Sequence, residues 1–217
     1  MSLPSVEAAR ATMLSAIVPL ASEAMSLAEA DGCWLGEPVT AIRDQPPFDA
    51  SAMDGWAVRS ADVRPGARLG IVGESAAGHD AGVTVGAGWA ARIFTGAALP
   101  PGSDRVVIQE EAERDGDRVV LAAAPDAPTW VRPRGCDFRA GAVLLETGTR
   151  LNPWRLALAA SAGRATVTCR RRPVVAILST GDELVAPGEP AGPHQIYDAC
   201  APALAAFVRR SGGTPTL

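Results

Sequence analysis

The chain has 217 residues, of which 47% are hydrophobic and 20% charged, and its formal net charge is −4 at pH 7. This length suits one or two domains with a buried core. The weak negative charge argues against a nucleic-acid-binding protein, which normally carries a basic face. No apolar run approaches the roughly 18 residues of a transmembrane helix, and residues 1–10 lack the pattern of a secretory signal. Neither nucleic acid nor a membrane is an expected partner.

The cysteines and basic residues narrow the chemistry further. The four cysteines are widely spaced and form no CxxC pair, which excludes a zinc ribbon. Incidental thiols favour a cytoplasmic chain. All 20 basic residues are arginine, so a lysine Schiff base and a P-loop lysine are excluded within these residues.

The first thirty residues are expected to be helical. Ser5 can cap a helix that has Glu7 in its first turn. Pro19 is expected to end or kink this helix. Residues 22–30 suggest a second short helix, which Gly32 ends.

Short apolar runs then alternate with glycine and proline between residues 39 and 131, which is typical of a small β-domain, either a barrel or a sandwich. Asp115 and Gly116 predict a hairpin turn that links the last two expected strands. Strands are expected at residues 56–58, 68–72, 88–93, 105–109 and 118–122.

A strand at residues 142–145 and a helix are expected next. Asn152 caps this helix, Pro153 lies in its first turn and Gly163 marks its end. A strand over residues 165–169 follows.

Residues 173–178 form a continuous apolar run, typical of a strand buried on both faces of a parallel sheet. A helix over residues 202–210 and a strand from Thr214 are expected after it. One strand, one helix and four more residues cannot bury both faces of an α/β sheet, so we expect this region to be incomplete.

Two segments place polar groups beside the expected β-strands. Residues 46–59 set Ser51 and Asp54 between a rigid Pro-Pro and a strand, although such residues often only satisfy turn amides. Residues 93–102 place Thr95 and Gly96 at a strand end. Their hydroxyl and amide could hold an oxyanion, and an ordinary strand exit is the alternative.

Two further segments combine charges with glycine. Arg132, Arg134 and Asp137 suit either an anionic ligand or a solvated hinge. Asp182 and Glu183 follow the apolar run, at the edge where α/β sheets bind ligands. Mg²⁺ would relieve the repulsion between them, and an acid pair at a helix N-terminus is the alternative. Together the four segments suit an Mg²⁺-assisted reaction on a phosphate-bearing ligand.

Residues 46–59 closely resemble a signature of the molybdopterin molybdenumtransferases (MoeA and the E domain of gephyrin). Four more segments resemble further signatures of this family in the same order and spacing, namely residues 92–110, 135–138, 179–184 and 195–198. The resemblance covers essentially the whole chain. Family members continue beyond the equivalent of Leu217.

The resemblance implies a multidomain α+β fold. Residues 1–20 and 139–172 would form an elongated helical dimerisation domain, residues 21–138 a mainly β inserted domain, and residues 173–217 the start of an α/β molybdopterin-binding domain. It also implies a cytoplasmic homodimer.

The implied activity is the insertion of molybdate into adenylylated molybdopterin, with Mg²⁺ assisting and AMP leaving. The residues on the family's functional positions would have two roles. The catalytic set is Asp54, Thr95, Asp137 and Glu183, and the cofactor-binding set is Ser51, Gly96, Thr180, Gly181 and Asp182. Glu183 and Asp182 would hold Mg²⁺. Asp54 and Thr95 are expected from one subunit and Glu183 from the other.

Two alternatives remain open. The chain could be a non-catalytic dimeric scaffold, which needs neither Asp54 nor Glu183. It could also bind molybdate without transferring it. In that case Thr95, Gly96, Arg132 and Arg134 would matter most. Because much of the implied substrate pocket lies beyond residue 217, we expect negligible turnover from this chain alone.

Overall fold

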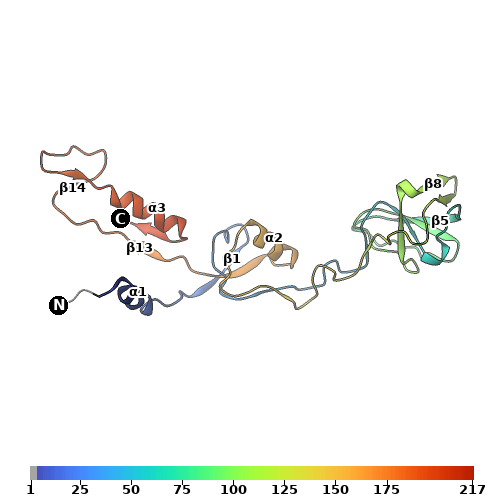
Figure 1. The fold of residues 1–217 in the computed structure, drawn as a ribbon, viewed down its shortest axis with the longest axis horizontal. Coiled ribbons are helices and arrows are strands. Elements are labelled where there is room, and N and C mark those ends of the chain that lie inside the picture. Colours follow the sequence, from blue (N-terminus) through green and yellow to red (C-terminus); the bar gives the residue numbers. More distant parts are fainter. Residues whose placement is uncertain (1–3) are drawn as a thin grey trace. The chain divides into compact units, whose positions relative to one another are not determined.

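The computed structural model describes residues 4–217, which contain three α-helices and sixteen β-strands (Figure 1). Residues 1–3, the start of the predicted N-terminal region, lie outside the described residues. The chain divides into two compact units. The β-unit comprises Thr40–Ala142 with Ser161–Gly163, and the terminal unit comprises the chain up to Val39, Val143–Ala160 and Arg164–Leu217.

The β-unit is built on a six-stranded sheet in the order β7-β4-β6-β5-β9-β8. All five strands predicted between residues 56 and 122 are confirmed, with small shifts at their ends. These five strands are β4 (Gly55–Val58), β5 (Arg68–Ser75), β6 (Trp89–Ile93), β7 (Arg105–Ile108) and β9 (Arg118–Leu121). The sixth strand of the sheet is β8 (Ala112–Asp115), and one-turn 3₁₀ helices lie at Ser60–Asp62 and Gln109–Glu111.

The hairpin turn at Asp115 and Gly116 is confirmed, but one of its strands was predicted wrongly. The turn joins β8 to β9, with Asp115 opposite Arg118, and not β7 to β9. Residues 112–115 are mostly polar and exposed, so they carry no apolar alternation that would have revealed an edge strand.

Side chains on both faces of this sheet are buried. Trp56 and Val58 of β4 belong to one apolar cluster, whereas Ala57 belongs to a second. Neighbouring residues of a strand point to opposite faces, so β4, buried at all four residues, contributes to both clusters. This strand, paired on one side with β6 and on the other with β7, begins immediately after Asp54.

Helix α1 (Val6–Ser15) opens the terminal unit. Its predicted cap is confirmed, because the Ser5 hydroxyl accepts a hydrogen bond from the backbone N–H of Ala8 at 3.2 Å. The helix ends at Ser15, before Pro19 could end it.

The predicted second helix is wrong. Ser22–Ser26 forms strand β1, which pairs antiparallel with β12 (Thr166–Arg170). This pairing joins residues 140 or more positions apart in the sequence, and no local pattern reports it. The fold class must be corrected with it, because this unit combines strand pairs with separate helices and is not a helical dimerisation domain. A second strand pair joins β2 (Val39–Thr40) and β11 (Val143–Leu145), where a strand was predicted.

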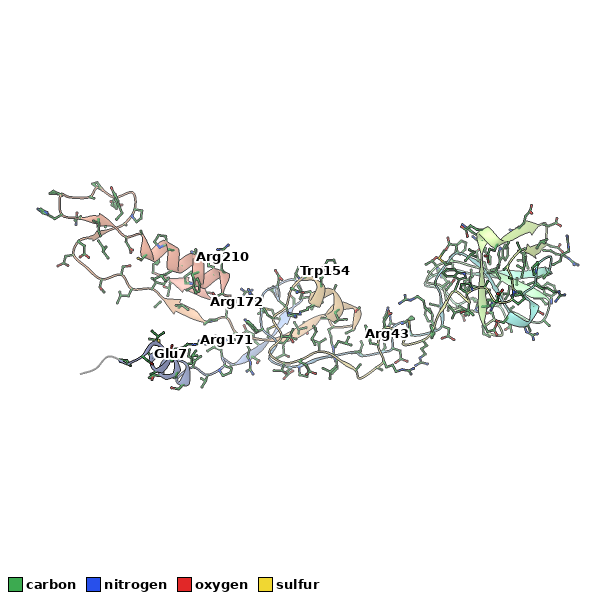
Figure 2. All side chains as sticks on the ribbon, viewed as in Figure 1. Glu7, Arg43, Trp154, Arg171, Arg172 and Arg210 are labelled. Carbon is green, nitrogen blue, oxygen red and sulfur yellow. The ribbon has the colours of Figure 1, made fainter. Side chains whose placement is uncertain are left out.

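Helix α2 (Pro153–Ser161) begins as predicted. The Asn152 side chain accepts a hydrogen bond from the backbone N–H of Arg155 at 2.9 Å, which satisfies one free donor of the first turn. Trp154 stands out from this helix and is 81% exposed (Figure 2).

Residues 173–217, called the C-terminal segment below, contain β13 (Val174–Ala176), β14 (Leu184–Val185), β15 (Ile196–Tyr197), α3 (Cys200–Arg210) and β16 (Thr214–Thr216). The predicted strand, helix and final strand are confirmed, and β13 pairs parallel with β16. The predicted burial of the apolar run is wrong, because Val174 is 73% and Leu178 86% exposed. Strand β13 has one neighbouring strand within the described residues, so its apolar side chains stay uncovered. No helix in residues 4–217 is long and apolar enough to cross a membrane.

Candidate functional site

Three of the polar segments meet in the β-unit. Strand β3 (Ala50–Ser51) pairs with β10 (Val131–Arg132), which brings residues 46–59 beside residues 132–138. Ala50 also forms a β-bridge with Ala98, which adds the segment of Thr95 and Gly96. Backbone pairing therefore assembles segments that are far apart in the sequence.

Asp54 is fixed by Thr95. One carboxylate oxygen, Oδ1, accepts hydrogen bonds from the Thr95 backbone N–H at 2.7 Å and from the Thr95 hydroxyl at 2.8 Å. These two bonds, with a smaller contribution from the charge of Arg92, hold the pKa of Asp54 below its usual value. The carboxylate is therefore ionised at neutral pH.

The second oxygen of Asp54, Oδ2, accepts no hydrogen bond from the described residues. Asp54 is half-buried, and Thr95 is exposed. The pair thus presents a negatively charged acceptor in a fixed orientation. Such an acceptor can bind a ligand N–H or O–H group.

Ser51 and Gly96 shape the loops around this pair. Ser51 is 1% exposed, and its hydroxyl donates to the carbonyl of Met53 at 2.5 Å. Gly96 has a φ of +81°, which favours glycine, and its N–H donates to the Ser51 carbonyl at 2.9 Å. The Thr95 hydroxyl and the Gly96 amide, which were considered for binding an oxyanion, thus both donate hydrogen bonds within the chain.

The charges of residues 132–138 are paired with each other and with nearby acids. Asp137 binds Arg132 at 2.7 and 2.8 Å, which raises the pKa of Arg132. Arg134 donates from Nε to Asp44 at 2.6 Å and from its backbone N–H to Asp49 at 2.7 Å. These arginines hold neighbouring loops of the β-unit together.

The remaining predicted residues lie in the terminal unit. Thr180, Asp182 and Glu183 are all exposed, in the loop between β13 and β14. The Glu183 carboxylate lies against Gly181, where a Cβ atom would sit 2.4 Å from Glu183 Oε2. Glycine at this position therefore leaves space for the acid.

The same loop borders a cavity of about 510 Å³. Its lining includes Ile177, Ser179, Gly181, Leu184, Asp198 and Leu217. Asp198 accepts hydrogen bonds from the first amides of α3 at 2.9 and 3.0 Å. A hydrogen bond from Ser179, followed by these amides, lowers the pKa of Asp198.

The sequence-based site set omitted three polar residues that contribute to these arrangements. Asp198 stood in a quoted signature, shortly before the helix expected over residues 202–210, and that position was the available signal. Arg92 and Gln109 contact the backbone beside Asp54. Both stand in the quoted signature of residues 92–110, which was the available signal. Arg92 lies on β6, and Gln109 begins the 3₁₀ helix that follows β7.

The acids form no complete metal site by themselves. In the described part of the chain, no three His, Cys, Asp or Glu side chains gather in a way that could hold a metal ion. Asp182 and Glu183 can supply two hard oxygen ligands, so a divalent cation would need further oxygens from a ligand or water.

Comparison with known proteins identifies the chain's family. A family model described as the MoeA N-terminal region (domain I and II) matches residues 4–163. The chain belongs to this family. The match covers the predicted residues of the β-unit and ends before Thr180.

The similarity to individual MoeA relatives extends further. The molybdopterin molybdenumtransferases of Nostoc sp. and Haemophilus influenzae are 41% and 38% identical over 90% and 89% of this chain. The chain spans about half the length of these curated relatives, 46% and 48%. A crystal structure of the molybdopterin biosynthesis MoeA protein from Pyrococcus horikoshii matches 99% of the chain with a TM-score of 0.85 and 32% identity. The chain covers 56% of that structure.

Proposed function

We propose that this chain acts in molybdenum cofactor biosynthesis, as part of an enzyme that inserts molybdate into adenylylated molybdopterin and releases AMP. The family membership and the names of the relatives support the reaction class. The observation that carries the proposal is the carboxylate of Asp54, whose Oδ1 is held by Thr95 and whose Oδ2 is open. A carboxylate held in this way is suited to orient a hydrogen-bond donor of the substrate.

In this proposal the β-unit supplies substrate-orienting groups. Asp54 accepts a hydrogen bond from the substrate through Oδ2. Thr95 keeps the carboxylate ionised and fixed, while Ser51 and Gly96 hold the surrounding turns. Asp137 acts through Arg132 to orient the neighbouring loop.

The loop of residues 179–183 is the proposed phosphate end of the site. Asp182 and Glu183 fit Mg²⁺ by donor type, because both offer exposed carboxylate oxygens and Gly181 leaves room beside Glu183. Bound Mg²⁺ would supply Lewis-acid stabilisation of phosphoryl oxygens. The Thr180 hydroxyl and the Gly181 backbone are proposed to contact the same phosphates.

We further infer that the working protein is a cytoplasmic homodimer. In such a dimer Asp54 and Thr95 come from one subunit and Glu183 from its partner. The resemblance to the family motivates this arrangement, and size measurement in solution would test the dimer.

Simple molybdate binding at Thr95 and Gly96 is less well supported. The donors of both residues are engaged, and Arg132 and Arg134 each direct one guanidinium nitrogen to an acid of the chain. An oxyanion there would have to replace several internal hydrogen bonds, whereas a ligand at Asp54 Oδ2 replaces none.

Binding of adenylylated molybdopterin to the purified chain tests the proposal. Titrations with and without Mg²⁺ would compare the wild type with Asp54→Asn and Glu183→Gln. Each substitution is expected to weaken binding about tenfold or more, because a hydrogen bond or ion contact made by a charged group contributes about 1.5–3 kcal/mol. Binding should also weaken without Mg²⁺ in the wild type.

Exposed acids serve as matched controls. Asp126→Asn in the β-unit and Glu189→Gln in the C-terminal segment change the charge equally, and neither lines the cavity beside Ser179. Both should leave the affinity unchanged. Absence of binding by a folded wild-type chain, or equal binding by all four variants, would overturn the proposal.

A further inference from the structure

Arg92 lies at the centre of an arrangement of side chains beside Asp54. It sits on β6 directly opposite Trp56 of β4. Its guanidinium lies over the Trp56 ring, 5.6 Å from the centroid, and over the Phe94 ring at 5.0 Å. Aromatic faces attract cations at such distances, so the two rings restrict the position of the charge.

The same guanidinium links two backbone segments. Nη1 donates to the carbonyl of Gly55 at 3.2 Å, and Nη2 donates to Gln109 Oε1 at 3.0 Å. Gln109 in turn donates its backbone N–H to the carbonyl of Asp54 at 3.1 Å. Arg92 thus connects the residue after Asp54 with the residue that holds the Asp54 carbonyl.

From these contacts we propose that Arg92 is a positioning residue that sets the orientation of the Asp54 carboxylate. Its guanidinium, held by two aromatic rings, links the Gly55 carbonyl to the Gln109 side chain, and we call these contacts the Arg92 clamp. This inference rests on the proposed function for the role of Asp54. Thr95 holds the side chain of Asp54, and the Arg92 clamp holds its backbone. Both are needed for Oδ2 to point in one direction.

Arginine suits this task better than lysine. Its planar guanidinium presents several donors in a fixed fork and stacks on aromatic rings, whereas a lysine ammonium is a strongly hydrated point charge. The charge of Arg92 also contributes to the lowered pKa of Asp54. Lysine should therefore preserve that charge effect while losing the clamp.

Substitution of Arg92 is expected to leave the β-unit folded. The side chain is half-buried and lines a cavity of about 330 Å³ with Trp56, Phe94 and Gln109. A shorter side chain would enlarge this open space without leaving a closed void. Arg114, which lines the same cavity, provides a matched control for loss of one positive charge.

The Thr95 amide offers a readout that is independent of substrate, because its N–H donates to Asp54 Oδ1. Its ¹H–¹⁵N signal should titrate with Asp54 in wild type, Arg92→Gln, Arg92→Lys and Arg114→Gln. In Arg92→Gln we expect a higher midpoint than in the wild type, and a shifted Gln109 amide signal. Arg92→Lys should restore the midpoint but not the Gln109 signal, and Arg114→Gln should resemble the wild type.

Ligand binding then separates this inference from the proposed function. Arg92→Gln should bind adenylylated molybdopterin about tenfold more weakly than the wild type, the size expected for losing one oriented charged hydrogen bond. If wild type does not bind but the Thr95 and Gln109 signals shift as described, the function fails and the clamp stands. Unchanged signals in a folded Arg92→Gln chain would overturn the clamp. Should that variant not fold, Gln109→Ala, which removes one acceptor of the clamp, must shift the Thr95 amide signal for the inference to survive.

Discussion

Asp54 and Glu183 are both acids in turns beside a strand, but their surroundings differ. Asp54 receives two hydrogen bonds from Thr95, a residue 41 positions away, and precedes a strand buried at all four residues. Glu183 is exposed, and its carboxylate accepts no hydrogen bond in the part of the chain described. Its neighbouring contact is with Gly181, two residues away.

This difference indicates how each acid can act. The β-unit presents Asp54 in a prepared orientation, so a ligand need not order it. The C-terminal segment offers acids whose orientation a ligand or cation must set, and ordering a free side chain costs entropy. We therefore expect the β-unit to be the more rigid of the two regions, and the following predictions test that contrast.

The largest effect on stability is expected for a substitution in β4, the strand that follows Asp54 in the sequence. A Cβ atom on Gly55 would lie 2.0 Å from the carbonyl oxygen of Val107 on the paired strand β7. Gly55→Ala should therefore destabilise the β-unit by about 3 kcal/mol, measured by urea unfolding. In Gly86→Ala the new Cβ would meet only Trp89 at 3.8 Å, and this control should change stability by less than about 0.5 kcal/mol. Equal stability of the two variants would refute the rigid β4 framework.

Thiol labelling sharpens the contrast within the terminal unit. Burial raises the pKa of the Cys169 thiol from 9.0 to about 11, and Cys169 is 0% exposed. The exposed Cys200 begins α3 in the C-terminal segment. At pH 8 the raised pKa lowers the thiolate fraction of Cys169 about 100-fold relative to its unshifted value. Labelling of the buried Cys169 should therefore be much slower than labelling of the exposed Cys200. Mass spectrometry with time would show this, and comparable rates would mean that the β1–β12 pair opens readily.

A third prediction concerns pH. Hydrogen bonds from the Ala140 amide and then Arg134 hold the pKa of Asp44 below its usual value. The stability from this ionised group is present above the unfolded pKa of about 3.9 and is lost as pH falls through the lower folded pKa. Asp44→Asn should lower the melting temperature at pH 7 and flatten its decline below pH 4. Asp126→Asn should keep the wild-type decline of the melting temperature with falling pH. If the curve for Asp44→Asn ran parallel to that of the wild type, this part of the pH dependence would not come from Asp44.

The smallest effect is expected at the β-unit surface. Arg68 and Asp115 form an ion pair in which both side chains are more than half exposed. Water and salt screen such pairs. Arg68→Gln should therefore change the free energy of unfolding by at most about 0.5 kcal/mol, and added salt should reduce the difference. A larger loss that persists in high salt would show that this ion pair is not screened as its exposure implies.

Local features of the sequence were enough to predict much of the chain. The caps at Ser5 and Asn152 and the turn at Asp115 involve contacts between residues a few positions apart. The strands of the β-unit follow from apolar runs between glycine and proline. The signature segments also pointed to Asp54 and Thr95 as residues of one site, and the structure shows the two in contact.

Tertiary structure decided what depends on distant partners. Ser22–Ser26 became a strand because Thr166–Arg170 pairs with it, and this pairing outweighs local helix preference. The apolar run over residues 173–178 stayed exposed, because burial depends on neighbouring elements and not on composition. The Arg92 clamp likewise required β4, β6 and the end of β7 to pair in register. A sequence read locally reports turns and periodicity, whereas only the folded chain specifies which distant groups satisfy each donor and charge.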